Sequence, residues 1–103
     1  MIQMHIGTQS EQQAIEIIDF LEDDKLIVDA LIIETQKRSR TNGISQHSTY
    51  YMILGKTKAL LFNTIDDALR SKYPDNLPSI YSTPIVNMDW DETKDLREKT
   101  AKV

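Results

Sequence analysis

Apolar and polar residues alternate from the start of the chain. Ile2, Met4 and Ile6 are separated by polar residues, which is the period of a half-buried strand over residues 1–6. Ser10 and Gln13 then form a capping-box pattern, in which each side chain satisfies a free amide at the start of a helix. The predicted helix has one apolar face, made of Ala14, Ile17, Ile18 and Leu21.

A long hairpin is predicted next. Residues 26–33 are an almost continuous apolar run typical of a strand, and a polar stretch follows them. Asn42-Gly43 predicts a type I′ turn, because both residues tolerate positive φ. The return strand is expected over residues 44–54. Residues 35–49 are too polar for the core of one domain, so the tip of the hairpin should project beyond the body.

The second half of the chain repeats the helix-to-strand order. Residues 58–72 have the apolar stripe of an amphipathic helix, with Thr57 as the expected cap. Pro74 and Pro78 follow, and because proline fixes φ and lacks an amide donor, they predict a rigid elbow before a last strand over residues 80–86. Asp89 with Glu92 predicts the start of a short, charged C-terminal helix.

The resulting order, β-α-β-β-α-β, is the ferredoxin-like split arrangement. We therefore expect an α+β fold in one domain over residues 1–103, with both main helices on one face of a four-stranded antiparallel sheet. The other face of such a sheet stays open. A small sheet with apolar residues on both faces tends to hide its bare side in an oligomer.

The segment Gly55-Lys56-Thr57, the helix after it and the elbow at residues 73–80 together resemble the CutA family of divalent-cation-tolerance proteins. That family shows a Lys-Thr pair before its second helix and a His-Pro-Tyr-x-x-Pro-x-Ile run after it, so Pro74, Pro78 and Ile80 match structural positions of the motif. The resemblance covers most of the chain. It implies a ferredoxin-like homotrimer, related in architecture to the PII signalling proteins, whose long hairpins reach across to neighbouring subunits.

The chain departs from the family pattern at positions that matter for ligands. Asp29 stands where the family usually has a cysteine, Tyr73 replaces the His of the elbow, and Asp75 replaces its Tyr. A copper site that depends on that cysteine is therefore not carried over. The resemblance is to a divergent member, whose ligand can differ from that of the family.

The charge and composition of the chain limit which classes of partner and binding site are expected. The net charge of −4 argues against nucleic acid and anionic membranes as primary partners. The absence of cysteine excludes disulfides, thiolate metal sites and a cysteine nucleophile. No apolar run approaches the ~20 residues that span a bilayer. The N-terminal residues do not form the pattern of a secretion signal, so a cytoplasmic location is expected.

Asp29, Lys56 and Thr57 are the candidate cleft residues. Asp29 interrupts an apolar strand, and an unpaired buried carboxylate is costly, so it should be hydrogen-bonded, exposed, at a subunit seam, or a ligand for a hard cation. Lys56 stands beside the start of a helix, a position that favours anions. We therefore expect a cleft where the second strand meets the second helix. The alternative is that Asp29 and Lys56 pair with each other across a subunit seam.

The two histidines, His5 and His47, have no partner at metal-ligand spacing. His47 stays a candidate for a divalent metal ion because a symmetric trimer could gather three copies of it, and Asp29 stays one because its carboxylate could bind a hard cation. Lys37, Arg38 and Arg40 form a small basic cluster, expected to be solvated on the hairpin.

These features favour a non-catalytic, homotrimeric CutA-like protein, because no catalytic set of residues can be assembled from the spacing. It would bind a small ligand or a divalent cation at clefts between subunits, in metal tolerance or signalling. One alternative is a PII-like regulatory module that binds a small anionic metabolite and contacts a partner protein through the hairpin. A second is a small cofactorless enzyme, which rests on analogy with other ferredoxin-like proteins alone.

Overall fold

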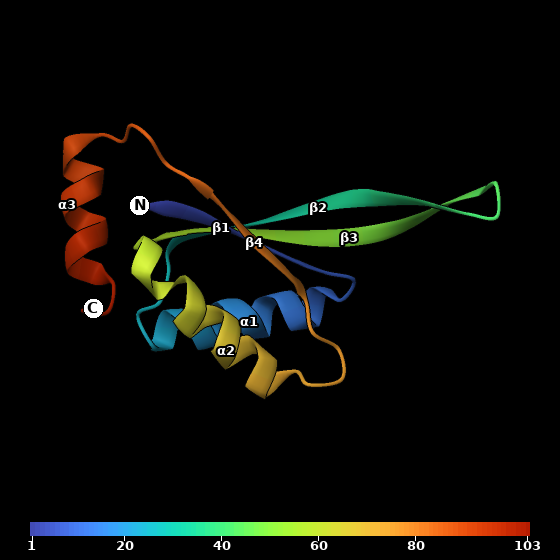
Figure 1. Cartoon of the computed structure of the whole chain (residues 1–103), viewed down its shortest axis with the longest axis horizontal. Helices are drawn as coiled ribbons and strands as arrows, with labels where there is room; N and C mark the ends of the chain where they lie inside the picture. Colours follow the sequence, from blue (N-terminus) through green and yellow to red (C-terminus); the bar gives the residue numbers. More distant parts are fainter.

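A computed structural model describes residues 1–103 and confirms the ferredoxin-like α+β fold. The strands form one antiparallel sheet in the order β2-β3-β1-β4, and α1 and α2 lie together on one side of it (Figure 1). None of the α-helices has the length and apolar content needed to cross a bilayer. The elements are β1 (Ile2–Thr8), α1 (Glu11–Asp23), β2 (Val28–Thr41), β3 (Ile44–Thr57), a 3-10 turn (Ala59–Leu61), α2 (Phe62–Lys72), β4 (Ser79–Pro84) and α3 (Trp90–Lys99).

The core lies between the sheet and these two helices. The alternation predicted for β1 places Met4 and Ile6 on the covered face, where both are fully buried. Ile17 of α1 and Ile65 of α2 pack against them and are also fully buried. Each such side chain contributes roughly 1.5–3 kcal/mol when it leaves water. The apolar stripes of both helices thus pack against the same face of the sheet.

The start of α1 follows the predicted capping box only in part. Ser10 Oγ accepts a hydrogen bond from the Gln13 backbone N–H at 3.1 Å, as expected. The Gln13 side chain does not return to the amide of Ser10. It is buried instead, its Nε2 donates to the carbonyl of Asn76 at 3.0 Å, and its Oε1 accepts from the Thr8 hydroxyl. Gln13 therefore ties the elbow to α1.

The prediction that Thr57 caps the second helix is wrong. Thr57 is the last residue of β3, paired with Ile2, and its side chain points into the core, where it is fully buried. Its hydroxyl donates to the carbonyl of Leu26 at 2.6 Å. A 3-10 turn intervenes before α2, and Lys58 precedes that turn without a side-chain cap. The strand runs further than predicted, which removes Thr57 from the helix start.

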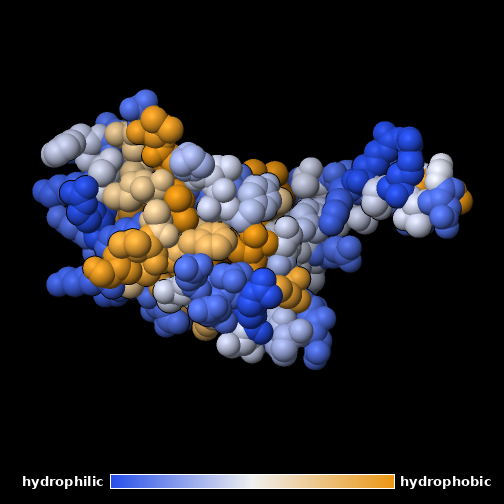
Figure 2. Space-filling model, in the orientation of Figure 1, coloured by the Kyte–Doolittle hydropathy of each residue, from blue (hydrophilic) through white to orange (hydrophobic).

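The hairpin projects as predicted. Asn42 and Gly43 have φ values of 53° and 78°, as a type I′ turn requires. β2 and β3 are each 14 residues long, longer than expected, and stay paired out to Thr41 and Ile44. Figure 1 shows this pair extending away from the body, and its outer surface is mostly hydrophilic (Figure 2). We call residues 35–50 the arm.

The elbow enters β4 through Pro78, which is buried directly before the first residue of the strand. Replacing Pro78 with Ala should lower the free energy of unfolding by about 0.4–1 kcal/mol, because the unfolded chain gains freedom that the native elbow does not need. Thermal unfolding measures this. Asp75→Ala, in the exposed part of the same turn, is the matched control and should leave the melting temperature unchanged. Equal melting temperatures for all three proteins would contradict the role of Pro78.

Candidate functional site

Asp29 lies on an irregularity of β2. The pairing register with β3 shifts between Val28 and Leu31, and Asp29 sits inside this shift with a φ of 56°. Left-handed backbone is unusual for residues other than glycine, but Asp tolerates it better than most. The bulge turns the carboxylate out, so Asp29 is exposed. An acidic residue thus interrupts the apolar run without being buried.

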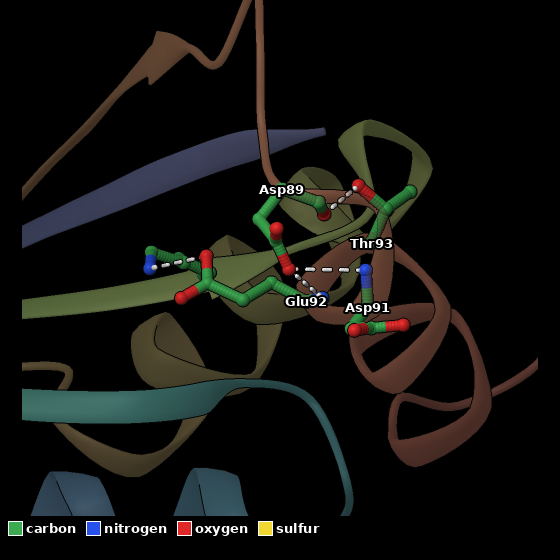
Figure 3. Close-up of polar contacts among 5 residues, drawn as sticks. Asp89, Asp91, Glu92 and Thr93 are labelled. Carbon is green, nitrogen blue, oxygen red and sulfur yellow. Dashed lines mark hydrogen bonds and ion pairs between the residues drawn. The ribbon is translucent and has the colours of Figure 1, made fainter.

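Lys56 has its ion-pair partner in α3. Its Nζ lies 3.8 Å from the Glu92 carboxylate, with the two side chains 29% and 55% exposed (Figure 3). An exposed pair of this kind adds less than about 1 kcal/mol. The pair with Asp29 that the sequence suggested is not formed within the chain, which leaves a pairing across a subunit seam as a prediction.

Glu92 is held in place by a well-capped helix. Asp89 accepts hydrogen bonds from the backbone N–H groups of Asp91 at 3.1 Å and Glu92 at 3.2 Å, so the predicted start of the C-terminal helix is confirmed (Figure 3). The end of α3 is anchored as well. Lys58 Nζ donates to the carbonyl of Ala101 at 2.8 Å, and the Ala101 N–H donates to the carbonyl of Lys25 at 2.7 Å. The helix therefore lies fixed at the end of the body opposite the arm (Figure 1).

The larger cavity, of about 530 Å³, lies elsewhere. It opens where the end of β1, the first turn of α1, the elbow and the root of the arm meet. Lys37 is the only charged residue in its wall, and no carboxylate lines it. Such a lining suits a small polar or anionic molecule better than a divalent cation, which prefers carboxylate oxygens. The lining residues are Gly7, Thr8, Gln9, Ser10, Gln13, Lys37, Tyr50, Asn76, Leu77, Pro78 and Ser79.

Tyr50 fixes the root of the arm against the body. It is 9% exposed, and Lys37 Nζ stands 4.8 Å from the centre of its ring, a cation–π distance. The ring passes so close to Gly7 that a Cβ at this glycine would collide with it. Gly7 is therefore required by the close approach of an aromatic ring.

The elbow side of the cavity is tied to α1 twice. Gln13 binds the carbonyl of Asn76, and the Tyr73 hydroxyl donates to the Glu16 carboxylate at 3.4 Å. Burial and the neighbouring charge of Glu16 raise the pKa of Tyr73 above its usual value, so its phenol keeps its proton and stays a donor at neutral pH. These contacts hold the elbow in one place beside the helix.

The structure does not bring the predicted site residues together in a cavity. Asp29, Lys56 and Thr57 line neither this cavity nor the smaller one, of about 300 Å³, beside Trp90 on α3. Thr57 is fully buried with its hydroxyl already bonded, so it offers no atom to a ligand. His47 is exposed on the arm. No group of three or more His, Asp or Glu side chains lies close enough to hold a metal ion within one chain. A ligand role for Asp29, Lys56 or His47 stays a prediction that a neighbouring subunit would have to complete.

Sequence reasoning missed the cavity, although two signals pointed toward it. The sequence predicts a capping-box role for the Gln13 side chain, whereas its burial and its bond to Asn76 place it in the cavity wall. The sequence predicts only a structural role for Pro78, and this residue also lines the cavity. Neither residue reveals by itself that the two segments meet.

The contact between Gly7 and Tyr50 predicts a specific coupling. Gly7→Ala should destabilise the protein by about 1–3 kcal/mol, because the new methyl group displaces the ring. In a Tyr50→Ala background the same substitution should cost almost nothing, since the colliding atoms are gone. Denaturant unfolding of the four proteins gives the two differences. If Gly7→Ala cost the same in both backgrounds, the collision would not be the cause.

Solved structures of other proteins share the fold of this chain. No protein-family model matches this chain, and no curated protein matches it in sequence. The crystal structure of CutA1 from Pyrococcus horikoshii superposes with a TM-score of 0.88 at 20% identity, over 99% of this chain and 100% of that one. The divalent cation tolerance protein (Cut A1) from Thermus thermophilus gives a TM-score of 0.84 at 23% identity, over 98% and 100%. CutA1 from Oryza sativa gives 0.87 at 14% identity, over 99% and 94%. The resemblance to the CutA family is thus confirmed for the fold, along the whole chain.

Proposed function

We propose that this chain is a divergent relative of the CutA1 divalent cation tolerance proteins and acts without catalysis, as a homotrimer that binds a small ligand or a divalent cation between its subunits. The fold shared over the full length supports the relationship. The resemblance to the CutA family supports three as the number of subunits. The observation that carries the proposal of self-assembly is the uncovered face of the sheet.

That open face is apolar. Leu31 on β2 is paired with Leu54 on β3, and Ile33 with Met52, so these four side chains form a patch on the side of the sheet away from α1 and α2. Leu31 is 59% exposed and Ile33 is 44% exposed. Farther along the same face, Tyr81 on β4 is 47% exposed. An apolar patch that crosses a whole sheet is typical of an interaction site.

The charge distribution favours a second copy of the chain as the occupant. The arm carries three cations, Lys37, Arg38 and Arg40, and none of the 16 Asp and Glu residues. The body therefore holds the other nine of the 12 Lys and Arg residues against all 16 carboxylates, a net charge of −7. The arm points away from its own body (Figure 1). A basic arm and an acidic body on every copy make copies of this chain electrostatically complementary to one another.

The arm should therefore be needed for assembly more than for folding. Replacing residues 38–46 with a short Asn-Gly turn removes little buried apolar surface, so the helical circular dichroism signal should stay while the mass in solution falls. A second variant, Arg38→Gln with Arg40→Gln, keeps the length of the arm and should weaken assembly most at low salt, where exposed charges are least screened. Full assembly of the shortened protein would show that the arm is not an assembly device.

The cavity supports a second candidate function, a PII-like regulatory module that binds a small anionic metabolite. Its wall combines one cation, Lys37, with the hydroxyl groups of Thr8 and Ser10, and contains no carboxylate. Lys37 and Tyr50 belong to the root of the arm, so a molecule bound there would contact the part of the chain that could also meet a partner protein.

A thermal-shift comparison separates a cation from an anion. Chlorides of divalent metals form one panel, and sodium salts of phosphates and di- and tricarboxylates form the other. A ligand at 100 times its Kd should add about 2.7 kcal/mol to the stability of the native state. Stabilisation by a cation that Asp29→Asn abolishes supports the first function. Stabilisation by an anion that Lys37→Met abolishes, while Arg40→Met outside the cavity does not, supports the second. A response to neither panel would contradict both ligand proposals.

A further inference from the structure

His5 occupies the middle of the open face. It is paired with Leu54 on one side and with Tyr81 on the other, and Leu54 is in turn paired with Leu31, so one row of side chains crosses all four strands. The imidazole stacks on the Tyr81 ring, with centroids 4.6 Å apart and an angle of 8° between the planes. Its Nε2 lies 3.1 Å from the hydroxyl of Thr83 on the same face. The imidazole of His5 is therefore held parallel to the Tyr81 ring, within a mainly apolar surface.

None of the strand residues beside His5 on this face carries a carboxylate. The neighbours of His5 on β3 and β4 are Leu54 and Tyr81, and β2 contributes Leu31 and Ile33 to the face. Two charged strand residues lie on the same side: Lys56, one row away and paired with Glu92 of α3, and Lys37, farther out on the arm. Asp29 lies on the bulge of β2, two strands away from His5 in the sheet. A positive charge on His5 would thus lie among apolar side chains and the Tyr81 ring, with no carboxylate beside it on the strands.

We propose that His5 makes self-association through the open face dependent on pH, so that the assembled form requires neutral His5. This inference rests on the proposed self-assembly. Covering the open face would remove His5 from water, and burying an ionised group without an opposite charge is strongly unfavourable. The neutral ring can be buried, since it stacks on Tyr81 and shares a hydrogen bond with Thr83. Protonation therefore favours separate subunits.

The direction of the effect follows from linkage. Histidine gains its proton as the pH falls from 8 to 5, and the separate subunits bind that proton more readily than the assembly does. Association should therefore be strong at pH 8 and weaken as the pH falls. Between pH 8.0 and 5.5, the association constant should fall about tenfold for each His5 that the assembly buries. Most carboxylates stay ionised down to about pH 5, so the range from pH 8 to 5.5 isolates the histidines.

The chain offers a matched control, because it has two histidines. Sedimentation equilibrium of the full chain at pH 8.0, 6.5 and 5.5, at one ionic strength, gives the association constant, and circular dichroism shows that the subunit stays folded. His47→Gln, on the arm, should dissociate at low pH as the wild type does. His5→Phe, which can still stack on Tyr81, should stay assembled at pH 5.5. His5→Gln, neutral at every pH, serves the same purpose if the Phe variant does not fold.

The outcomes distinguish a failure of the proposed role of His5 from a failure of the proposed self-assembly. A wild-type chain that is assembled at pH 8.0 and equally so at pH 5.5 would overturn the role of His5 and leave the proposed self-assembly standing. Loss of pH dependence in His47→Gln, or its persistence in both His5 variants, would also overturn the role of His5. A wild-type chain that is monomeric at pH 8.0 and micromolar concentration would overturn the self-assembly itself, and the inference with it.

Discussion

The packing of α1 and α2 against one face of the sheet is the interaction on which the rest of this structure depends. Both helices place their apolar stripes on the same side, where Met4, Ile6, Ile17 and Ile65 become fully buried. The remaining helix, α3, lies at the end of the body (Figure 1). The apolar residues of the opposite face therefore remain in contact with water unless another molecule covers them.

Two sets of contacts then position the surfaces that a partner or ligand would meet. At one end of the body, Lys56 and Lys58 hold α3 through Glu92 and the carbonyl of Ala101. At the other end, Tyr50 packs over Gly7 and fixes the root of the arm, while Gln13 fastens the elbow to α1. The wall of the cavity at that end is thus formed by segments that are far apart in sequence, and these contacts hold the segments together.

The sequence correctly predicted the features that depend on interactions between neighbouring residues in the chain. The alternation in β1, the Asn42-Gly43 turn and the Asp89 cap each depend on neighbouring residues, and each is confirmed. The roles of Thr57 and the Gln13 side chain were predicted wrongly, because tertiary partners outcompete the local ones: Leu26 for the first and Asn76 for the second. Glu92 as the partner of Lys56, and the cavity itself, depend on contacts between distant segments, which residue spacing does not encode.

The central claim is that copies of this chain cover one another's open face. The most direct test is light scattering on two matched variants, Leu31→Asp on the open face and Leu60→Asp at a residue that is 76% exposed on the 3-10 turn. Both side chains are exposed in the single chain, so neither substitution should unfold it. We expect a multimer for the wild type and for Leu60→Asp, and a mass near the 11.9 kDa of one chain for Leu31→Asp. A wild type of 11.9 kDa, or an unchanged mass for Leu31→Asp, would contradict this claim.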